Sequence, residues 1–235
     1  MIRPLPCLAP HGLPPGGVVC HVLNRANARA TIFEDDNDFM AFERVMAQTI
    51  GVVRMRILAY LIMPNHWHLV LWPRRDDGLG RFMQRLTTTH VRRWHLNRHS
   101  IGDGHLYQGT YKSFPVQNDA HLLTVLRYVE RNTLRANLVA RAEAWRWSSL
   151  WLRLNPKVET EAPPLSPWPV ERPGNWGWRV NQPETDEELN ALRESARRGR
   201  PFSSERWQKR IGKRLGLEST FRPRGRPTRT QTTSS

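Results

Sequence analysis

Cysteine is scarce in this chain. Only two occur among the 235 residues, Cys7 and Cys20, and they lie thirteen positions apart without a CxxC pair. Disulfide frameworks and thiolate zinc sites need several cysteines at short, regular spacing. The sequence therefore argues against both, and we expect the two thiols to be chemically inert.

Long hydrophobic runs are also missing. No stretch approaches the roughly 20 uninterrupted apolar residues that span a bilayer, and the N-terminus lacks a charged start followed by a long apolar run. We expect no membrane segment, no membrane partner and a cytoplasmic location. Apolar residues still make up 39% of the chain, with ten tryptophans, which is enough to fill a core.

Acidic residues are few compared with basic ones. The chain has 36 Lys and Arg against 21 Asp and Glu, a net charge of +15. Residues 193–235 hold thirteen of the basic residues and three of the acidic ones, a net of +10, so the first 192 residues carry only +5. A strongly positive chain of this kind typically binds a polyanion, most often nucleic acid.

Hydrophobic periodicity predicts an α+β domain. Apolar runs and alternating stretches predict four strands, and apolar residues at helical spacing predict two helices between them. The order β-α-β-β-α-β is that of a ferredoxin-like fold. In chain order, the predicted elements cover residues 17–24, 35–50, 53–63, 66–72, 79–91 and 111–116.

A further helix is predicted from residue 119 to about residue 132, and the region after it divides the chain. Residues 155–183 are rich in proline and have no sustained period, which predicts a linker or an ordered extended arm. We therefore predict a first domain at 1–154, the arm at 155–183 and a small basic helical region at 184–235.

Two helices are expected in the basic region. Thr185 and Glu188 are spaced as a capping box, and Gly216 is placed to end the second helix. Beyond it, Arg224 and Arg226 flank a glycine between prolines, as in an AT-hook that lies in a narrow minor groove. A simple solvated basic tail is the equally weighted alternative.

His66 and His68 lie two residues apart on a predicted strand. Alternation places both imidazoles on one face and Trp67 on the other, a geometry suited to a shared metal ion. Two imidazoles accept manganese or magnesium when oxygen ligands complete the shell, but they do not select one ion. An HxH triplet also arises by chance, so this pattern alone leaves the question open.

Tyr128 and Asn132 are four residues apart on the next predicted helix, with His121 and Arg135 along the same stripe. An asparagine oxygen can bind a metal, and a phenolate one turn away can attack a phosphodiester. Taken alone, a helical tyrosine more often packs its ring and hydrogen-bonds through its hydroxyl.

Together these segments resemble a known family. Met63-Pro64-Asn65-His66-Trp67-His68, followed some sixty residues later by the segment from Tyr128 to Val139, is similar to the single-tyrosine HUH transposases, in particular the REP-associated tyrosine transposases. The resemblance also covers residues 20–22, 25–29, 106–114, 145–149, 201–207 and 222–227.

The resemblance implies a ferredoxin-like nuclease domain with an added catalytic helix. His66, His68 and Asn132 are then expected to hold a divalent ion, Mg²⁺ or Mn²⁺. Tyr128 is expected to cut single-stranded DNA near repeat hairpins, forming a 5′-phosphotyrosine link and freeing a 3′-hydroxyl. The chain is expected to act as a monomer or a homodimer. The expected DNA-binding residues are Arg25, Asn27, Arg29, Lys112, Arg224 and Arg226.

The chain departs from the family pattern at three backbone positions. Thr133 stands where proline is usual, and Asn137 and Ala26 stand where glycine is usual. None of the three is a proposed ligand or nucleophile, so the departures concern the local backbone. If a positive φ is needed at position 137, the asparagine must supply it.

Other interpretations remain open at this level. Tyr107 and Tyr111 are rival nucleophiles without a metal ligand one turn away, and a structural role is expected for them. A non-cleaving hairpin-binding protein on the same fold is the main alternative function. A rolling-circle initiator or relaxase is a weaker one, and the chain contains no P-loop motif. The remaining histidines, expected to be exposed or near phosphate, are His90, His95, His99 and His105.

Overall fold

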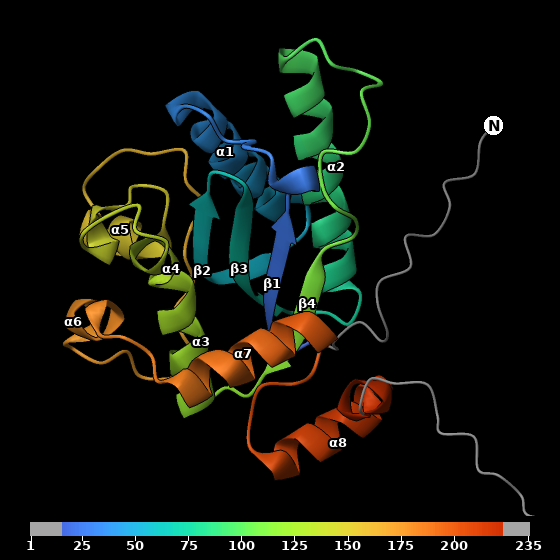
Figure 1. Ribbon diagram of the computed structural model, residues 1–235, viewed down its shortest axis with the longest axis vertical. Helices are drawn as coiled ribbons and strands as arrows, with labels where there is room; N and C mark the ends of the chain where they lie inside the picture. Colours follow the sequence, from blue (N-terminus) through green and yellow to red (C-terminus); the bar gives the residue numbers. More distant parts are fainter. Residues whose placement is uncertain (1–15, 223–235) are drawn as a thin grey trace, which may run out of the picture.

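The computed structural model describes residues 16–222, and its centre is a four-stranded sheet (Figure 1). The strands lie in the order β2-β3-β1-β4, and every neighbouring pair is antiparallel. This arrangement confirms the predicted ferredoxin-like α+β fold. In chain order, the elements of this unit are β1 (Val19–Arg25), α1 (Asp36–Val52), β2 (Met55–Met63), β3 (His66–Pro73), α2 (Gly78–Asn97) and β4 (Lys112–Val116).

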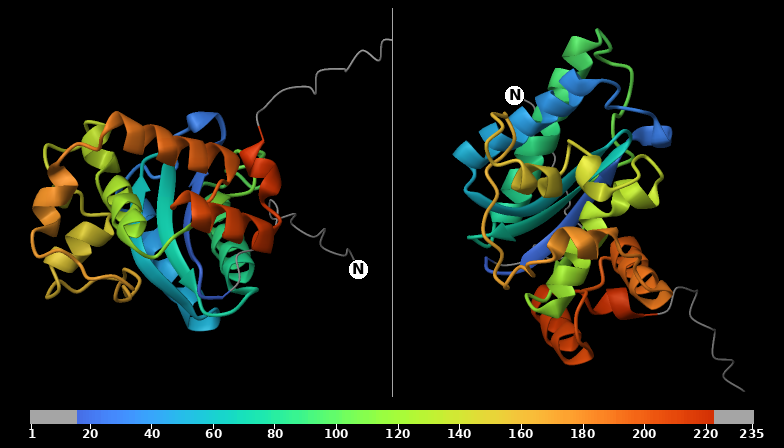
Figure 2. Two further views of the ribbon diagram at one scale, coloured as in Figure 1. Left: turned by 90° about the horizontal axis from the view of Figure 1, so that it is seen from below. Right: turned by 90° about the vertical axis from the view of Figure 1, so that its left-hand side faces the viewer.

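The two faces of the sheet have different coverings. Alternation along the strands sends Val22 and Trp67 into a core shared with α1 and α2. The opposite face carries Phe114 and Val70, which pack against helix α3 (Ala120–Glu130). The sheet therefore lies between two helical layers, as the right-hand view of Figure 2 shows.

The β2-β3 hairpin sets the position of the two histidines. Pro64 and Asn65 form the predicted turn, and the register pairs Met63 with His66 and Leu61 with His68. On the other side of β3, Arg25 of β1 pairs with His66, and Leu23 pairs with His68. Paired residues share a face of the sheet, so both imidazoles lie on the α3 side.

The helix that follows β4 is interrupted near its end. The predicted single helix is divided into α3 and a short α4 (Asn132–Arg135), with Arg131 between them. Asn137 then adopts a φ of 56°. The amide of Asn137 donates to Leu134 O and the amide of Leu138 donates to Thr133 O, which together form a Schellman turn. The asparagine therefore supplies the left-handed conformation that glycine usually provides.

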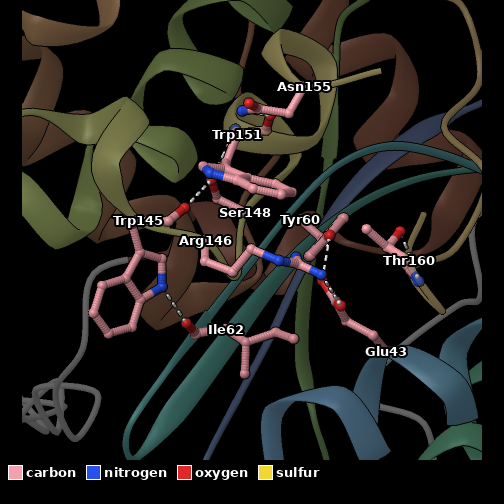
Figure 3. Close-up of polar contacts among 10 residues, drawn as sticks. Glu43, Tyr60, Ile62, Trp145, Arg146, Ser148, Trp151, Asn155 and Thr160 are labelled. Carbon is pink, nitrogen blue, oxygen red and sulfur yellow. Dashed lines mark hydrogen bonds and ion pairs between the residues drawn. The ribbon is translucent and has the colours of Figure 1, made fainter. Parts of the chain in front are cut away.

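The segment after α4 packs along the β2 side of the sheet. It contains the 3₁₀ turn η2 (Ala142–Ala144), helix α5 (Ser149–Leu154), an extended arm and α6 (Trp176–Asn181). Trp145 Nε1 donates to Ile62 O at 2.8 Å (Figure 3). The arm also forms a parallel bridge between Leu165 and Ile57. A segment without periodicity is thus ordered by its contacts with β2.

Glu43, a buried acid of α1, connects this helix with β2 and with the segment after α4. Tyr60 donates a 2.5 Å hydrogen bond to Glu43, whose carboxylate also lies 3.4 Å from the guanidinium of Arg146 (Figure 3). Glu43 and Tyr60 are fully buried. Burial raises the pKa of the Glu43 carboxyl in spite of these partners. The contacts among Glu43, Tyr60 and Arg146 therefore hold α1, β2 and the segment after α4 together.

Two longer helices complete the described chain, α7 (Asp186–Arg198) and α8 (Glu205–Leu215), followed by the 3₁₀ turn η3 (Glu218–Phe221). The predicted capping box between Thr185 and Glu188 is present at the start of α7. Gly216 ends α8 in the left-handed conformation, as predicted. Within residues 16–222, no helix is long and apolar enough to cross a membrane.

Candidate active site

The residues predicted to carry chemistry meet in one cleft of about 540 Å³. His66 and His68 reach it from β3, Tyr128 from α3 and Asn132 from α4. The cleft lies on the face of the sheet that α3 covers, where α7 also packs against β4 (Figure 1). One chain therefore brings all four side chains together.

The protonation of His66 follows from its hydrogen bonds. The amide nitrogen of Asn65 donates to the carbonyl of Arg29 at 3.3 Å, so its side-chain oxygen is the atom that lies 2.6 Å from His66 Nδ1. An amide oxygen only accepts, and Nδ1 of His66 must therefore carry the proton. The Nε2 lone pair of His66 is left free.

A longer chain of contacts decides the protonation of His68. A guanidinium only donates, so the 2.8 Å bond from Arg135 fixes the Asn132 side-chain oxygen on the arginine side. The Asn132 amide nitrogen then donates to His68 Nε2 at 2.8 Å. His68 Nδ1 must carry the proton, which it donates to His21 Nε2 at 2.9 Å. Both proposed histidine ligands thus have an unprotonated Nε2.

Burial keeps these imidazoles neutral. It lowers the pKa of His66 to about 4, helped by the charges of Arg25 and Arg135, and it lowers the pKa of His21 to about 3. The pKa of His68 is driven well below its usual value by burial and by the neighbouring rings. A neutral imidazole is the form that binds a metal.

The donor set fits a divalent cation. Among residues 16–222, no group of three or more His, Cys, Asp or Glu side chains is arranged to hold a metal ion. The histidine pair therefore needs another kind of donor, and Asn132 is the polar side chain beside His68. Its nitrogen faces His68, so ligation through its oxygen requires the amide to turn about its last side-chain bond, which is a soft rotation.

Tyr128 stands beside the histidines. Its ring centroid lies 6.1 Å from that of His68 and 6.2 Å from that of His21, both in edge-on contacts. The guanidinium of Arg135 lies over the Tyr128 ring, 4.3 Å from its centroid. No hydrogen-bond partner of the Tyr128 hydroxyl lies among residues 16–222. The ring is therefore held by packing and by a cation-π contact, and its hydroxyl is uncommitted.

The helix that carries Tyr128 is anchored by a buried glutamate. Glu130 accepts from Ser149 Oγ at 2.6 Å and from Trp176 Nε1 at 2.7 Å. Burial raises the pKa of its carboxyl. Ser149 begins α5, at the end of the first predicted domain, and Trp176 begins α6, in the predicted arm. The C-terminal end of α3 is therefore held by both of these segments.

The predicted DNA-binding residues do not all reach the cleft. Arg25 and Lys112 line it. Asn27 and Arg29 belong to an exposed 3₁₀ turn, η1 (Asn27–Arg29), beyond the end of β1 and outside the cleft lining. Arg224 and Arg226 lie outside the described residues.

The rival tyrosines take other positions. Tyr107 is buried on the opposite side of the sheet, where its hydroxyl accepts from Trp67 Nε1 at 2.9 Å and lies 2.7 Å from His90 Nδ1. Tyr111 packs against the same core. Neither tyrosine lines the cleft.

The prediction for His90 is wrong, because this side chain is buried between Phe33 and Phe42. His90 follows Phe82 and Leu86 at intervals of four residues, so it continues the apolar stripe of α2. His99 and His105 are exposed, and His95 is half-buried.

Sequence reasoning also missed His21, which lies behind His68, and two arginines that line the cleft. His21 had a detectable signal, because alternation along β1 places it on the same face as Leu23, the partner of His68. Arg193 and Arg197 of α7 line the cleft, although they lie in the region predicted to be a separate basic unit. No local pattern reports which strand a distant helix packs against.

The comparisons with known proteins agree with the fold. Residues 17–132 match the family model described as "Transposase IS200 like". Comparison with curated proteins found no match. A solved structure of a REP-associated tyrosine transposase bound to a REP hairpin is similar in fold, with a TM-score of 0.51 and 16% identity over 68% of this chain and 94% of that chain.

Two further structures give TM-scores of 0.37, too low to carry an argument. One is a candidate transposase from Deinococcus radiodurans R1, 18% identical over 48% of this chain and 88% of that chain. The other is the tRNA(His) guanylyltransferase of Saccharomyces cerevisiae, 14% identical over 54% of this chain and 62% of that chain.

Proposed function

The chain belongs, through residues 17–132, to the IS200-like transposase family, and from this premise we propose that it is a metal-dependent single-strand DNA endonuclease and strand transferase. The observation that carries the proposal is the meeting of Tyr128 with His66, His68 and Asn132 in one cleft of one chain. This meeting within a chain supports catalysis by a monomer or by each subunit of a homodimer.

The charge of the cleft supports a nucleic-acid substrate. Five basic side chains line it, and no Asp or Glu is among its lining residues. A concave surface of one sign concentrates a polyanion and binds phosphates in a salt-dependent way. The basic lining residues are Arg25, Lys112, Arg135, Arg193 and Arg197.

In the proposed reaction, the Tyr128 oxygen attacks a backbone phosphorus and the bond from phosphorus to the 3′ oxygen breaks. The result is a 5′-phosphotyrosine and a 3′-hydroxyl, with the phenol proton transferred in net terms to the leaving oxygen. His66, His68 and Asn132 would hold a divalent ion, Mg²⁺ or Mn²⁺, and when bound this ion would polarise a non-bridging phosphate oxygen. The phosphodiester is conserved in the link, so rejoining needs no nucleotide cofactor.

The side chains of this protein have definite tasks in the reaction. Arg135 packs over the Tyr128 ring, and it donates to the Asn132 oxygen through a bond that must break before that oxygen can bind a metal ion. Asn65 and His21 keep the Nε2 atoms of the two histidines unprotonated. Because the similar structure contains a REP hairpin, we extend the proposal to single-stranded DNA with hairpin repeats as the substrate.

Each of the three predicted regions of the chain is proposed to have its own role. Residues 1–154 carry the chemistry, 155–183 form the arm and 184–235 add basic surface. Both later regions contact the first, through Trp176 on Glu130 and through α7 on β4.

The nucleophile is tested by incubating the protein with labelled hairpin-bearing single-stranded DNA and Mn²⁺. We expect a covalent adduct that Tyr128→Phe abolishes and Tyr111→Phe, the matched control, retains. An adduct that persists in Tyr128→Phe would overturn the assignment of the nucleophile.

The metal ligands are tested in the same assay. His66→Ala and His68→Ala should lose cleavage and keep most of the DNA affinity, because they remove ligands and leave the basic surface intact. Tight hairpin binding by the wild-type protein without Mn²⁺ binding or an adduct would instead identify a non-cleaving DNA-binding protein.

A further inference from the structure

Helix α7 reaches the cleft from the C-terminal region. Its residues Arg193, Ala196 and Arg197 line the cleft together with Lys112 of β4. The helix comes almost sixty residues after Asn132, yet it lies next to α3 on the same face of the sheet (Figure 1). The cleft is therefore shared between the transposase-like unit and the C-terminal region.

Apolar contacts fix α7 in this place. Leu192 is buried in the core formed with Phe114, and Ala196 packs against it. Just after α7, the amide of Phe202 donates to Pro115 O at 2.8 Å and its carbonyl accepts from the amide of Gln117 at 3.2 Å. These bonds hold the chain beside β4 at the C-terminal end of α7.

Ion pairs fix the other end of the helix. Three arginines at intervals of four residues form a stripe along α3 and α4. Two glutamates face them, one just before α7 and one in its first turn. The Glu184 side chain is only 1% exposed, which places this carboxylate in the interface. The pairs are Arg127 with Glu188, Arg131 with Glu184 at 3.6 Å, and Arg135 with Glu184 at 3.5 Å.

The arginines of α7 differ in their partners. Arg197 donates twice to Glu194, and Arg198 contacts the same carboxylate and the carbonyl of Arg222. Arg193 is exposed, and it has no ion-pair or hydrogen-bond partner within residues 16–222. Of these three guanidiniums, that of Arg193 is the uncommitted one, and it faces the cleft.

We propose that α7 forms a wall of the DNA cleft and that Arg193, with Lys112, binds backbone phosphates of the single strand that enters it. A guanidinium suits a phosphate because its planar set of donors matches the phosphate oxygens. Because α7 is docked through both of its ends, the backbone at Arg193 is in place before DNA arrives, and only the arginine side chain loses conformational freedom on binding. The inference rests on the proposed function and assigns to α7 a direct contact with substrate.

The test measures the affinity of labelled hairpin-bearing single-stranded DNA by fluorescence anisotropy over a series of salt concentrations. Arg193→Ala should weaken binding about tenfold at low salt. It should also reduce the slope of log K against log salt by about 0.7, the value of one phosphate contact on a single strand. Because Arg193 is exposed, the melting temperature of the variant should equal that of the wild type.

Arg92→Ala is the matched control, because Arg92 is an exposed arginine of α2 on the opposite face of the sheet. It should leave both the affinity and the salt slope unchanged. An Arg193→Ala variant with wild-type affinity and slope would overturn the inference, as would an equal loss in both variants. Adduct formation by the wild type is measured in parallel, so failure of the proposed nuclease activity is distinguished from failure of the α7 contact.

Discussion

His21 and His68 share a hydrogen bond of 2.9 Å between Nε2 of the first ring and Nδ1 of the second, and the two ring planes are nearly parallel, 10° apart. His21 comes from β1 and His68 from β3, so the contact crosses the strand pair at the centre of the sheet. Since His68 donates in this bond, His21 fixes the tautomer that presents Nε2 of His68 to the cleft.

Replacing His21 by leucine should weaken metal binding. The substitution removes the acceptor of the His68 Nδ1 proton, and loss of such an outer partner typically costs about 10- to 100-fold in metal affinity. Titration calorimetry with Mn²⁺ measures the effect. His121→Leu is the control, because this half-exposed histidine pairs with Asp119 outside the cleft. A folded His21→Leu protein with wild-type Mn²⁺ affinity would contradict the role of His21.

Asn137 should prefer glycine to alanine. Its φ of 56° is costly for a residue with a β-carbon, and asparagine reduces this cost through local hydrogen bonding. We expect Asn137→Ala to lower the free energy of unfolding by about 1 kcal/mol and Asn137→Gly to leave it equal or higher. Urea denaturation measures both. Equal stability of the alanine and glycine variants would show that the Schellman turn does not impose this conformation in solution.

Glu43 should be important for stability. Glu43→Ala leaves the Tyr60 hydroxyl and the Arg146 guanidinium without their shared partner inside the protein. Breaking a buried pair in this way costs about 3 kcal/mol. Glu43→Gln keeps an acceptor for Tyr60 and should cost much less, since burial already opposes the charge of this carboxylate. Chemical denaturation measures the free energy of unfolding of both variants. A larger loss of stability in Glu43→Gln than in Glu43→Ala would contradict the prediction.

His90 should make the fold sensitive to acid. Burial lowers its pKa from 6.5 to about 3, so between these values the unfolded chain binds a proton that the folded protein does not. The free energy of unfolding therefore falls as the pH falls through this range. One such group contributes about 1.4 kcal/mol per pH unit well below 6.5.

The acid sensitivity is checked by urea denaturation between pH 7 and pH 5. His90→Gln should reduce the slope of the unfolding free energy against pH by the amount that corresponds to about one bound proton. His99 is exposed, so His99→Gln should leave the slope unchanged. The slope is compared rather than the stability itself, because removing a buried ring also alters packing around Phe33 and Phe42. Parallel slopes for wild type and His90→Gln would contradict the prediction.

Local periodicity in the sequence predicted which neighbouring side chains share a face. Alternation over residues 66–68 predicted that both imidazoles share a face, and the spacing of Tyr128 and Asn132 predicted their proximity. The same rule applied to residues 82, 86 and 90 identifies a buried histidine, so the wrong prediction for His90 was avoidable.

Other features could not be predicted from local patterns. The break between α3 and α4 and the path of the arm along β2 depend on contacts between segments far apart in the chain. The tail's net charge of +10 suggested a separate basic unit, whereas the structure places two of its arginines at the cleft.

The sequence by itself determined the β-α-β-β-α-β order, the shared face of His66 and His68 and the excess of positive charge, because each depends on neighbouring residues or on simple counting. Only the tertiary structure decided that His21 lies behind His68, that Asn132 contacts His68, and that α7 forms part of the cleft. These relationships arise from packing across the sheet. His21 lies 47 positions from His68, and His68 lies 64 positions from Asn132, and no local period records which distant partner a side chain will meet.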